Sequence, residues 1–412
     1  MKLIFFSLMI TAVLSTTACS SNSVNSSWDN WRGPNYDGSA EGSGLPITFS
    51  QSENVKWQVN LGGTGASTPV ISGNYIFLTA ADLEKKELLA ICVDKISGKK
   101  VWSKSVGSGY KPGGDGTEVR LGSRSTYASP SAVTDGKTVV FFFGNGDLVA
   151  LSATDGKEVW RRNIQKDEGD FTFQWTFSAT PTLFKGKVYL PVLQRDTVTN
   201  GRGKNGTESF ILCYDVTDGK KLFKHVRPSD AKKESLEAYT TLIPAKIDGK
   251  MQLVLAGGDV FTGHDTETGK ELWRWGTWNK NHREQWWRLV PSPVLGPDNI
   301  FLVCAPKKAP VYAIQIKEGK ANLLWKSKER GKVTSDVPTP LYYKDHFYVL
   351  SDIKRCLSKI NPKTGEVVWI VPAPGLSKYR SSPLGADGKI YLSAGDTCTD
   401  LCFRSVDRLR GT

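Results

Sequence analysis

A short phrase that recurs along the chain limits the possible folds more than any other feature. Its clearest copy is residues 265–273 (DTETGKELW), in which Trp273 follows Gly269 by four positions. Polar residues and a glycine between two apolar runs are typical of a tight β-hairpin. The same phrase, with Trp or Phe as its aromatic residue, ends at Trp102, Trp160, Phe223 and Trp369, and in a longer form at Trp325. The phrase is therefore expected to be a repeated unit of structure.

Each repeat also contains an earlier hairpin, such as residues 131–143 or 182–190. Two hairpins give four strands per unit, and four-stranded units that recur at roughly 40–50 residues are typical of a β-propeller. The expected units are residues 67–107, 127–164, 177–227, 239–279, 288–328 and 336–371, with a seventh that starts at residue 380. We therefore predict an all-β propeller of four-stranded antiparallel blades, seven of which are visible.

The recurrent aromatic residue is expected to hold successive blades together. A large ring at the end of each outer strand can be buried against the next blade and contributes a large apolar area. The predicted blade-docking residues are Trp57, Trp102, Trp160, Phe223, Trp273, Trp325 and Trp369. Residues 55–60 resemble an outer strand without the three strands before it, so we predict that they close the ring by completing a blade begun at the C-terminus.

The two ends of the chain differ from the repeats. Residues 1–18 are expected to be a lipoprotein-type signal peptide followed by the lipidated Cys19, or else a signal for plain secretion. Residues 19–27 follow as a polar tether, and the turn-rich segment 28–54 is expected to pack across the propeller. We expect an extracytoplasmic protein of the cell envelope, in the periplasm or at the outer membrane. From residue 396 the repeat pattern fails, which suggests a truncated end.

The net charge of +13 is expected to gather on one face, because lysines are frequent in the tight turns. This face could rest on anionic lipid or polysaccharide, or it could simply be solvated. No compact basic motif with interleaved aromatic residues indicates nucleic-acid binding. Cys92 and Cys213 share one repeat position and are expected to be buried, and His264 is expected to be structural rather than a metal ligand.

At this point the chain resembles the pyrroloquinoline-quinone (PQQ) type repeat propellers, over residues 28 to about 395. The phrases WRGPNYDG, GGDVFTGHDTETGKELWRWGTWN and CAPKKAPVYAI resemble an envelope-associated PQQ-binding-like group of planctomycete-type bacteria. In outline the chain is also similar to the propeller lipoprotein of the outer-membrane β-barrel assembly machinery. The resemblance implies eight blades and no settled biochemical activity.

The long connections between blades are expected to share the face opposite the tight turns. Elaborated loops on a regular scaffold are common binding sites. Residues just before each inner strand, and one loop histidine, are the candidates for binding at this face. They are Arg124, Tyr127, Gln174, Trp175, Tyr239, His282, Trp287, Arg288, Asp336, Tyr379 and Arg380. The alternative is that these residues only pack blades and line a hydrated channel. In the long loop 193–209, which contains Arg195, Asp196 and Arg202, an Arg–Asp pair is expected to pin the chain.

Two functions from different classes remain open. The first is a noncatalytic, membrane-tethered propeller, expected to be monomeric, that binds an envelope protein or a glycan and needs no cofactor or metal. The second is a PQQ-dependent dehydrogenase for alcohols or aldoses, with calcium, or a degenerate relative. The resemblance implies a calcium site and often a pair of adjacent cysteines for such an enzyme. No two cysteines are neighbours here, and no carboxylate cluster has calcium-loop spacing.

Overall fold

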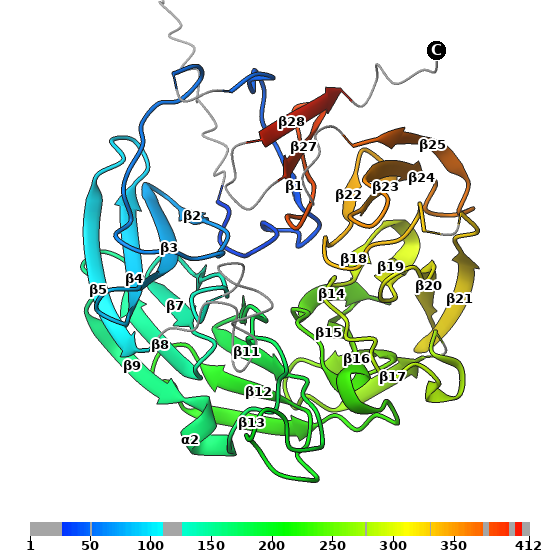
Figure 1. The fold of residues 1–412 in the computed structure, drawn as a ribbon, viewed down its shortest axis with the longest axis horizontal. Helices are drawn as coiled ribbons and strands as arrows, with labels where there is room; N and C mark the ends of the chain where they lie inside the picture. Colours follow the sequence, from blue (N-terminus) through cyan, green and yellow to red (C-terminus); the bar gives the residue numbers. More distant parts are fainter. Residues whose placement is uncertain are drawn as a thin grey trace, which may run out of the picture.

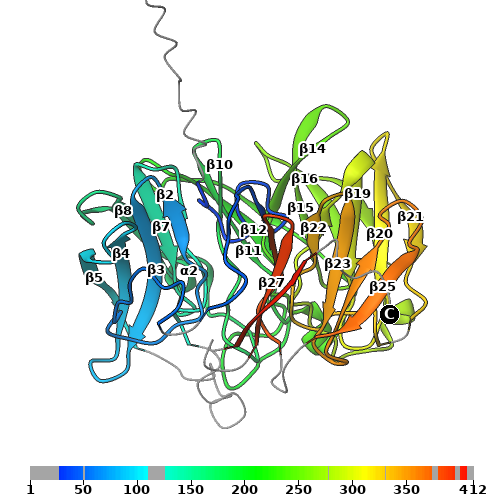
Figure 2. The ribbon, with the colours of Figure 1, turned by 90° about the horizontal axis from the view of Figure 1, so that it is seen from above.

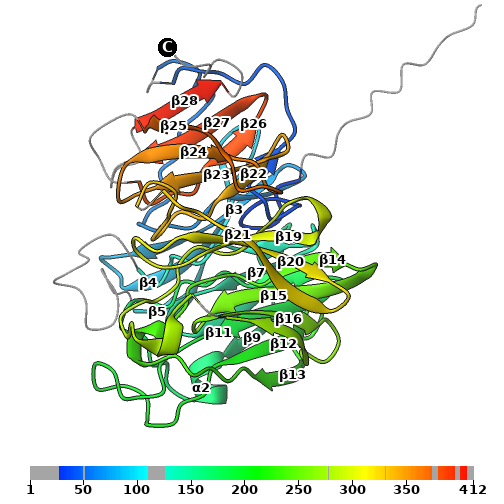
Figure 3. The same ribbon diagram turned by 90° about the vertical axis from the view of Figure 1, so that its right-hand side faces the viewer.

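Seven small β-sheets stand around a common axis, as the predicted propeller requires (Figure 1). The computed structural model describes residues 27–49, 52–109, 126–276, 278–329, 331–373, 379–394 and 400–405. Within these residues every sheet has four strands, and six of the sheets use four consecutive strands in chain order. The predicted all-β propeller of four-stranded blades is therefore confirmed. Figures 2 and 3 show the same sheets from the edge of the disc.

The strand bounds follow the predicted units closely. The first sheet has β2 (Val70–Ser72), β3 (Tyr75–Asp82), β4 (Glu87–Asp94) and β5 (Lys100–Ser108). The second has β6 (Val133–Thr134), β7 (Thr138–Phe142), β8 (Asp147–Ser152) and β9 (Glu158–Asn163), before the short helix α2 (Ile164–Glu168). The third has β10 (Thr182–Phe184), β11 (Lys187–Val192), β12 (Phe210–Asp215) and β13 (Lys221–Val226).

The remaining sheets continue this order. The fourth has β14 (Ile243–Ile247), β15 (Lys250–Gly257), β16 (Val260–Asp265) and β17 (Glu271–Trp275). The fifth has β18 (Val294–Leu295), β19 (Ile300–Cys304), β20 (Val311–Lys317) and β21 (Lys320–Lys326). The sixth has β22 (Leu341–Tyr343), β23 (His346–Ser351), β24 (Cys356–Ile360) and β25 (Val367–Pro372). The seventh combines β1 (Ser39–Ala40) with β26 (Leu384–Ala386), β27 (Lys389–Ala394) and β28 (Asp400–Ser405).

The repeated phrase forms the turn between the last two strands of a sheet. In the fourth sheet, the Asp265 carboxylate accepts a hydrogen bond of 2.8 Å from the backbone N–H of Thr268. The backbone N–H of Gly269 donates to the Asp265 carbonyl at 2.9 Å. Gly269 has φ +70, and a Cβ atom there would lie 2.4 Å from the Phe223 ring. The turn therefore needs glycine both for its left-handed backbone and for the close approach of the neighbouring ring.

At four of the turn glycines, the aromatic ring that covers the turn comes from the preceding sheet. The indole of Trp102 lies over Gly156, the turn glycine of the second sheet, and its Nε1 donates to the Ala153 carbonyl at 3.1 Å. The same arrangement joins Trp160 to Gly219, Phe223 to Gly269 and Trp325 to Gly365. Trp369 lies with its ring 5.9 Å from that of Tyr348. Each of the first four rings thus covers the turn of the following sheet.

Trp273 is placed differently from these rings. Its Nε1 donates to the Gln252 side chain at 2.8 Å, within its own sheet, and its ring packs on Gly263. Nothing lies within 4 Å of the space that a Cβ at Gly319, the next turn glycine, would occupy. The physical reason is the turn between β20 and β21, where Lys317 pairs directly with Lys320 and leaves only a two-residue connection.

The prediction that residues 55–60 close the ring is wrong. These residues form no strand, although Trp57 lies over Gly98 and donates to the Lys95 carbonyl at 3.0 Å. Trp57, Val59 and Leu61 pack on the first sheet. The strand that completes the last sheet is instead β1, which pairs parallel with the inner strand β26. Strand β28 lies within the C-terminal stretch that was expected to be anomalous, and the described residues form seven sheets rather than eight.

The segment before β1 contacts the inner strands of the first two sheets and the residues just before the inner strands of the sixth and seventh. Trp28 forms a bridge with Ile71 of the first sheet, and the Asp29 carbonyl accepts from Thr134 of the second. The buried guanidinium of Arg32 donates to the Pro340 carbonyl at 3.0 Å and to the Pro383 carbonyl at 2.8 Å, which belong to the sixth and seventh units. The N-terminal segment therefore ties the ends of the ring together.

We expect Arg32→Ala to lower the free energy of unfolding by about 2–3 kcal/mol. The change leaves the Pro340 and Pro383 carbonyls buried without their donor, and each unsatisfied group costs on the order of 1–3 kcal/mol, partly relieved by water. Urea unfolding followed by tryptophan fluorescence measures the loss. A variant as stable as the wild type would show that the ring closes without this contact.

Hydroxyl side chains link neighbouring inner strands in a way the repeat analysis did not anticipate. The hydroxyl of Ser131 accepts from the Thr68 N–H at 2.8 Å, and that of Thr180 accepts from the Ser131 N–H at 3.1 Å. The series continues from Thr241 to Ser292, Thr339 and Ser382. The recurrent Ser or Thr, often followed by Pro, is the sequence signal for it.

Other predictions concern single residues. Cys92, Cys213, Cys304 and Cys356 are buried free thiols, and His264 is fully buried between the Gly269 carbonyl and the Thr262 hydroxyl. In the described part of the chain, no helix is long and apolar enough to span a bilayer. Cys19, the signal peptide and most of the tether lie outside the described residues.

Candidate functional site

Several of the predicted binding residues meet in one polar network on the face that carries the connections between sheets, here called the loop face. Gln174 and Trp175 come from the loop before β10, Tyr239 precedes β14, Arg288 precedes β18 and Asp336 precedes β22. Each of these residues therefore lies just before the inner strand of a sheet, near the axis. The shared place in the repeat brings together side chains that are far apart in sequence.

Glu237, which the sequence analysis did not select, is the centre of this network. Its carboxylate is fully buried and forms an ion pair with the Arg195 guanidinium. It also accepts from the Tyr239 hydroxyl at 2.7 Å and from the Gln174 N–H at 3.1 Å. Arg195 also donates to the Gln174 side chain at 2.5 Å. Arg195 does not supply the expected Arg–Asp pair of this loop, because it turns inward to a carboxylate from the neighbouring loop.

A second group of charges, joined to the first through the loop before β14, contains Glu234, Arg288 and Asp336. Glu234 accepts from the Trp175 Nε1 at 2.8 Å and lies 3.9 Å from the Arg288 Nε. Arg288 donates to Asp336 at 3.3 Å, and the Asp336 N–H donates to the Asp352 carboxylate at 3.0 Å. Each carboxylate in this group therefore has a partner from the protein.

The other predicted residues lie apart from the network. Tyr127 packs with the core of the first and second sheets, and Tyr379 is fully buried beside the sixth and seventh. Arg380 is exposed, and its charge acts on Asp352. Arg124 lies outside the described residues.

Burial raises the pKa of Glu237 to about 7, from an ordinary value of 4.5, despite the neighbouring Arg195. Between these two values the folded state holds a proton that the unfolded chain has released. The contribution of this group to stability is therefore complete below pH 4.5 and is lost as the pH rises to about 7.

We expect the wild type to lose about 1–3 kcal/mol of stability between pH 4.5 and pH 8, relative to Glu237→Gln. The glutamine variant keeps the shape of the side chain but cannot titrate. Urea unfolding of both proteins across this pH range measures the difference. A difference that stays constant, or that grows in favour of the wild type as the pH rises, would contradict the assignment.

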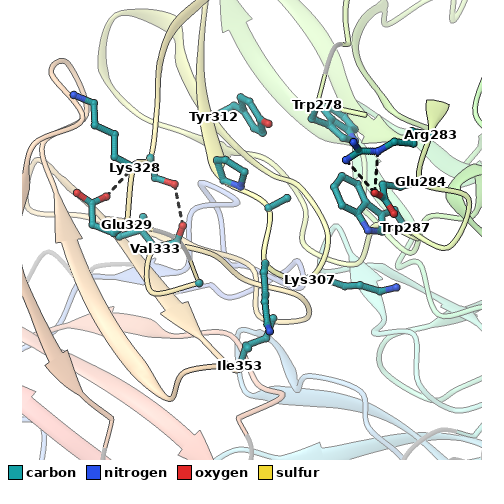
Figure 4. Close-up of a pocket in the computed structure, with 15 residues that line it drawn as sticks. Trp278, Arg283, Glu284, Trp287, Lys307, Tyr312, Lys328, Glu329, Val333 and Ile353 are labelled. Atoms are coloured by element: carbon teal, nitrogen blue, oxygen red, sulfur yellow. Dashed lines mark hydrogen bonds and ion pairs between the residues drawn. The ribbon is translucent and has the colours of Figure 1, made fainter. Parts of the chain in front are cut away.

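The loop face also carries a pocket of about 790 Å³, shown in Figure 4. It lies between the fourth, fifth and sixth sheets. Its walls come from the loop after β17, the connection between β19 and β20, the loop after β21 and the connection between β23 and β24. The lining includes Trp278, Trp287, Tyr312, Val333 and Ile353, together with Arg283, Glu284, Lys307, Lys308, Lys328 and Glu329.

A buried carboxylate fixes the loop that carries the two pocket tryptophans. Asp259 is 4% exposed and accepts from the Asn279 side chain at 2.7 Å. His282, a predicted binding residue, lies 3.2 Å from the same oxygen through its Nδ1. Burial raises the pKa of Asp259, whereas its bonds to His282, Asn279 and Trp278 act in the opposite direction. His282 therefore anchors the loop and does not line the pocket.

The residues of the loop face do not fit a calcium-assisted quinone site. A hard cation such as Ca²⁺ takes six to eight oxygen ligands, several from carboxylates. Glu237 is satisfied by Arg195, Tyr239 and Gln174, and Asp336 by Arg288 and a backbone N–H. Across the described ranges, no group of three or more His, Cys, Asp or Glu side chains converges to hold a metal ion.

Comparison with known proteins finds similarity to one protein family, to several dehydrogenases and to solved propeller structures. Residues 40–238 match the family described as "Outer membrane protein assembly factor BamB". The structure of BamB from Moraxella catarrhalis superposes with a TM-score of 0.55 at 14% identity, and covers 84% of this chain and 86% of that one. The quinohemoprotein alcohol dehydrogenase of Comamonas testosteroni is 27% identical over 261 residues, which is 60% of this chain.

The chain resembles the PQQ-like propeller repeat proteins in sequence over just under half of its length, and in fold. The match spans 32% of the length of the Comamonas dehydrogenase, and 20% of an alcohol dehydrogenase subunit from Gluconacetobacter polyoxogenes that is 30% identical over 163 residues. The solved BamB structure is similar in fold alone at this identity. Similar repeats thus occur in the family described as an outer membrane protein assembly factor and in alcohol dehydrogenases.

Proposed function

We propose that this PQQ-like propeller is a noncatalytic binding module of the cell envelope, which holds a protein or glycan partner in the pocket of its loop face. One observation carries the proposal: the pocket combines two indole rings with charged groups on loops that are fixed from behind by Asp259. Aromatic rings that offer a large rigid surface are typical anchors of binding sites. The anchor at Cys19 and the monomeric state belong to the same proposal.

Binding to envelope extract and to a glycan array tests the proposal. We expect Trp287→Ala to reduce the retained partner about tenfold or more, because Trp287 lines the pocket. Trp286→Ala is the matched control, since Trp286 is the adjacent residue, is 50% exposed and lies outside the pocket lining. Thermal melting of both variants shows that the fold persists. Equal binding by the wild type and Trp287→Ala would contradict the proposed site.

The second candidate function is PQQ-dependent oxidation of alcohols or aldoses, favoured by the names of the enzyme relatives. When bound, PQQ accepts electrons from the substrate. Purified protein with PQQ and Ca²⁺ is expected to show no dye reduction with these substrates. Turnover that Arg288→Ala or Asp336→Ala abolishes would establish the enzyme and overturn the proposal.

A further inference from the structure

Three lysines at the pocket carry charges that no carboxylate of the described residues compensates. Lys307, Lys308 and Lys328 are exposed, and no carboxylate within the described residues pairs with their ammonium groups. Glu284 pairs with Arg283 at 3.2 Å, and Glu329 accepts from the backbone N–H of Lys328 at 3.1 Å. The lining therefore keeps an excess of positive charge.

Several lysines in the tight turns of the opposite face form ion pairs with carboxylates. Lys157 lies 3.1 Å from Asp155, and Lys363 lies 2.7 Å from Asp298. Lys389, at the inner hairpin of the seventh sheet, lies 2.5 Å from Asp387. These charges are already partnered. The pocket lysines thus offer a charge to a ligand that those turn lysines do not.

The rest of the pocket is apolar and aromatic. Trp287, Pro310, Val333 and Ile353 form its walls, and Trp278 continues through Trp275, 5.7 Å away between ring centroids, into the packing between sheets. In Figure 4 the two labelled indoles lie together at one end of the pocket, with Arg283 and Glu284 beside them. Such a surface accepts an aromatic or aliphatic side chain.

The polar side chains of the pocket are mostly charged rather than neutral. The Ser327 hydroxyl already donates to the Val333 carbonyl at 3.0 Å and accepts from the Val311 N–H at 3.1 Å. The lining contains no Asn, Gln or Thr side chain. A neutral glycan would leave the excess positive charge of the lining without counter-charges, whereas the carboxylates of an acidic peptide would pair with it. The composition of the pocket favours a peptide.

We propose, building on the binding function above, that the partner enters as an acidic peptide segment with an aromatic or large aliphatic anchor. Its carboxylates pair with Lys307, Lys308 and Lys328, and its anchor side chain packs against Trp287. The net charge of +13 would also speed the approach of such a segment at low salt.

An array of synthetic octapeptides tests this inference directly. The number of Asp and Glu residues and the presence of a central Phe are varied independently, and the best sequence is then measured by fluorescence anisotropy. We expect binding that needs both features and that weakens as NaCl rises from 50 to 500 mM. Lys307→Asn with Lys308→Ser should weaken binding by about five- to tenfold. Asn is chosen because Lys307 has φ +57.

The control variant, Lys99→Ser with Lys220→Ser, removes the same charge from the turn face and should change the affinity less than twofold. Peptides that bind equally with Phe replaced by Ala, or that respond equally to both variants, overturn the inference. So does the absence of any peptide binding. If an oligogalacturonate binds instead and loses affinity in Trp287→Ala, the inference fails while the binding function stands. If no ligand responds to Trp287→Ala in any assay, both fail.

Discussion

Arg195→Ala is expected to lower the free energy of unfolding by about 3–5 kcal/mol. Arg195 forms its ion pair with Glu237 where the two side chains are 8% and 0% exposed. Removing the guanidinium leaves the carboxylate buried without its counter-charge, and breaking one side of a buried pair costs about this much. Urea unfolding at pH 8, where Glu237 would otherwise be ionised, measures the effect at its largest.

Two further variants separate this cause from a general loss of packing. Asp196→Ala removes the exposed neighbouring carboxylate and should change stability by less than about 0.5 kcal/mol. Arg195→Met combined with Glu237→Gln removes both charges and should recover a large part of the loss. A double variant no more stable than Arg195→Ala would show that the ion pair is not the source of the effect.

Trp273→Ala is expected to cost about 3–5 kcal/mol, the range for removing a buried aromatic ring from a core. Trp273 is 6% exposed, and its ring packs edge-to-face on Phe261 with 5.0 Å between centroids. Phe261 in turn contacts Phe301 of the fifth sheet at 5.4 Å. The loss should therefore loosen the contact between the fourth and fifth sheets as well as the fourth sheet itself.

Leu272→Ala is the matched control for this prediction. Leu272 precedes Trp273 on the same strand, but it is 48% exposed. Because little apolar area is lost there, its effect on the urea midpoint should be small. Comparable losses for the two variants would mean that the indole does not have the packing role assigned to it.

The blades could be predicted from sequence because their signals are local. A turn residue such as Asp265, a left-handed glycine such as Gly269 and an aromatic residue four positions later lie within one short phrase. The same phrase predicted a docking role for the ring. It could not show that Trp273 would stay within its own sheet, since that depends on the length of the next turn around Gly319.

Ring closure could not be predicted in the same way. The closing strand β1 consists of Ser39 and Ala40, and two small residues carry no periodic pattern. Arg32, which holds neighbouring units through backbone carbonyls, has no residue-specific partner that a sequence could reveal. The sequence of residues 55–60 has the pattern of a strand because these residues also pack against a sheet. They do so without the hydrogen bonds of a β-ladder.

The candidate site was partly predictable for a related reason. Gln174, Tyr239, Arg288 and Asp336 share a position before inner strands, so their convergence follows from the repeat. Glu237 lies two residues before Tyr239, in a loop whose sequence does not follow the repeat. Its role depends on an ion pair with Arg195, which comes from another loop. Two of the three pocket lysines, Lys307 and Lys308, stand in the phrase CAPKKAPVYAI, which the sequence analysis used only as evidence of a family resemblance.

The central claim is that a partner enters the pocket on the loop face, and site-specific photocrosslinking tests it most directly. A photoreactive amino acid replaces either Ile353, inside the pocket, or Leu222, which is 41% exposed on the outer strand of the third sheet. After irradiation in envelope extract, the account predicts a covalent adduct from position 353 and none from position 222. An adduct from position 222 with none from position 353 would contradict it.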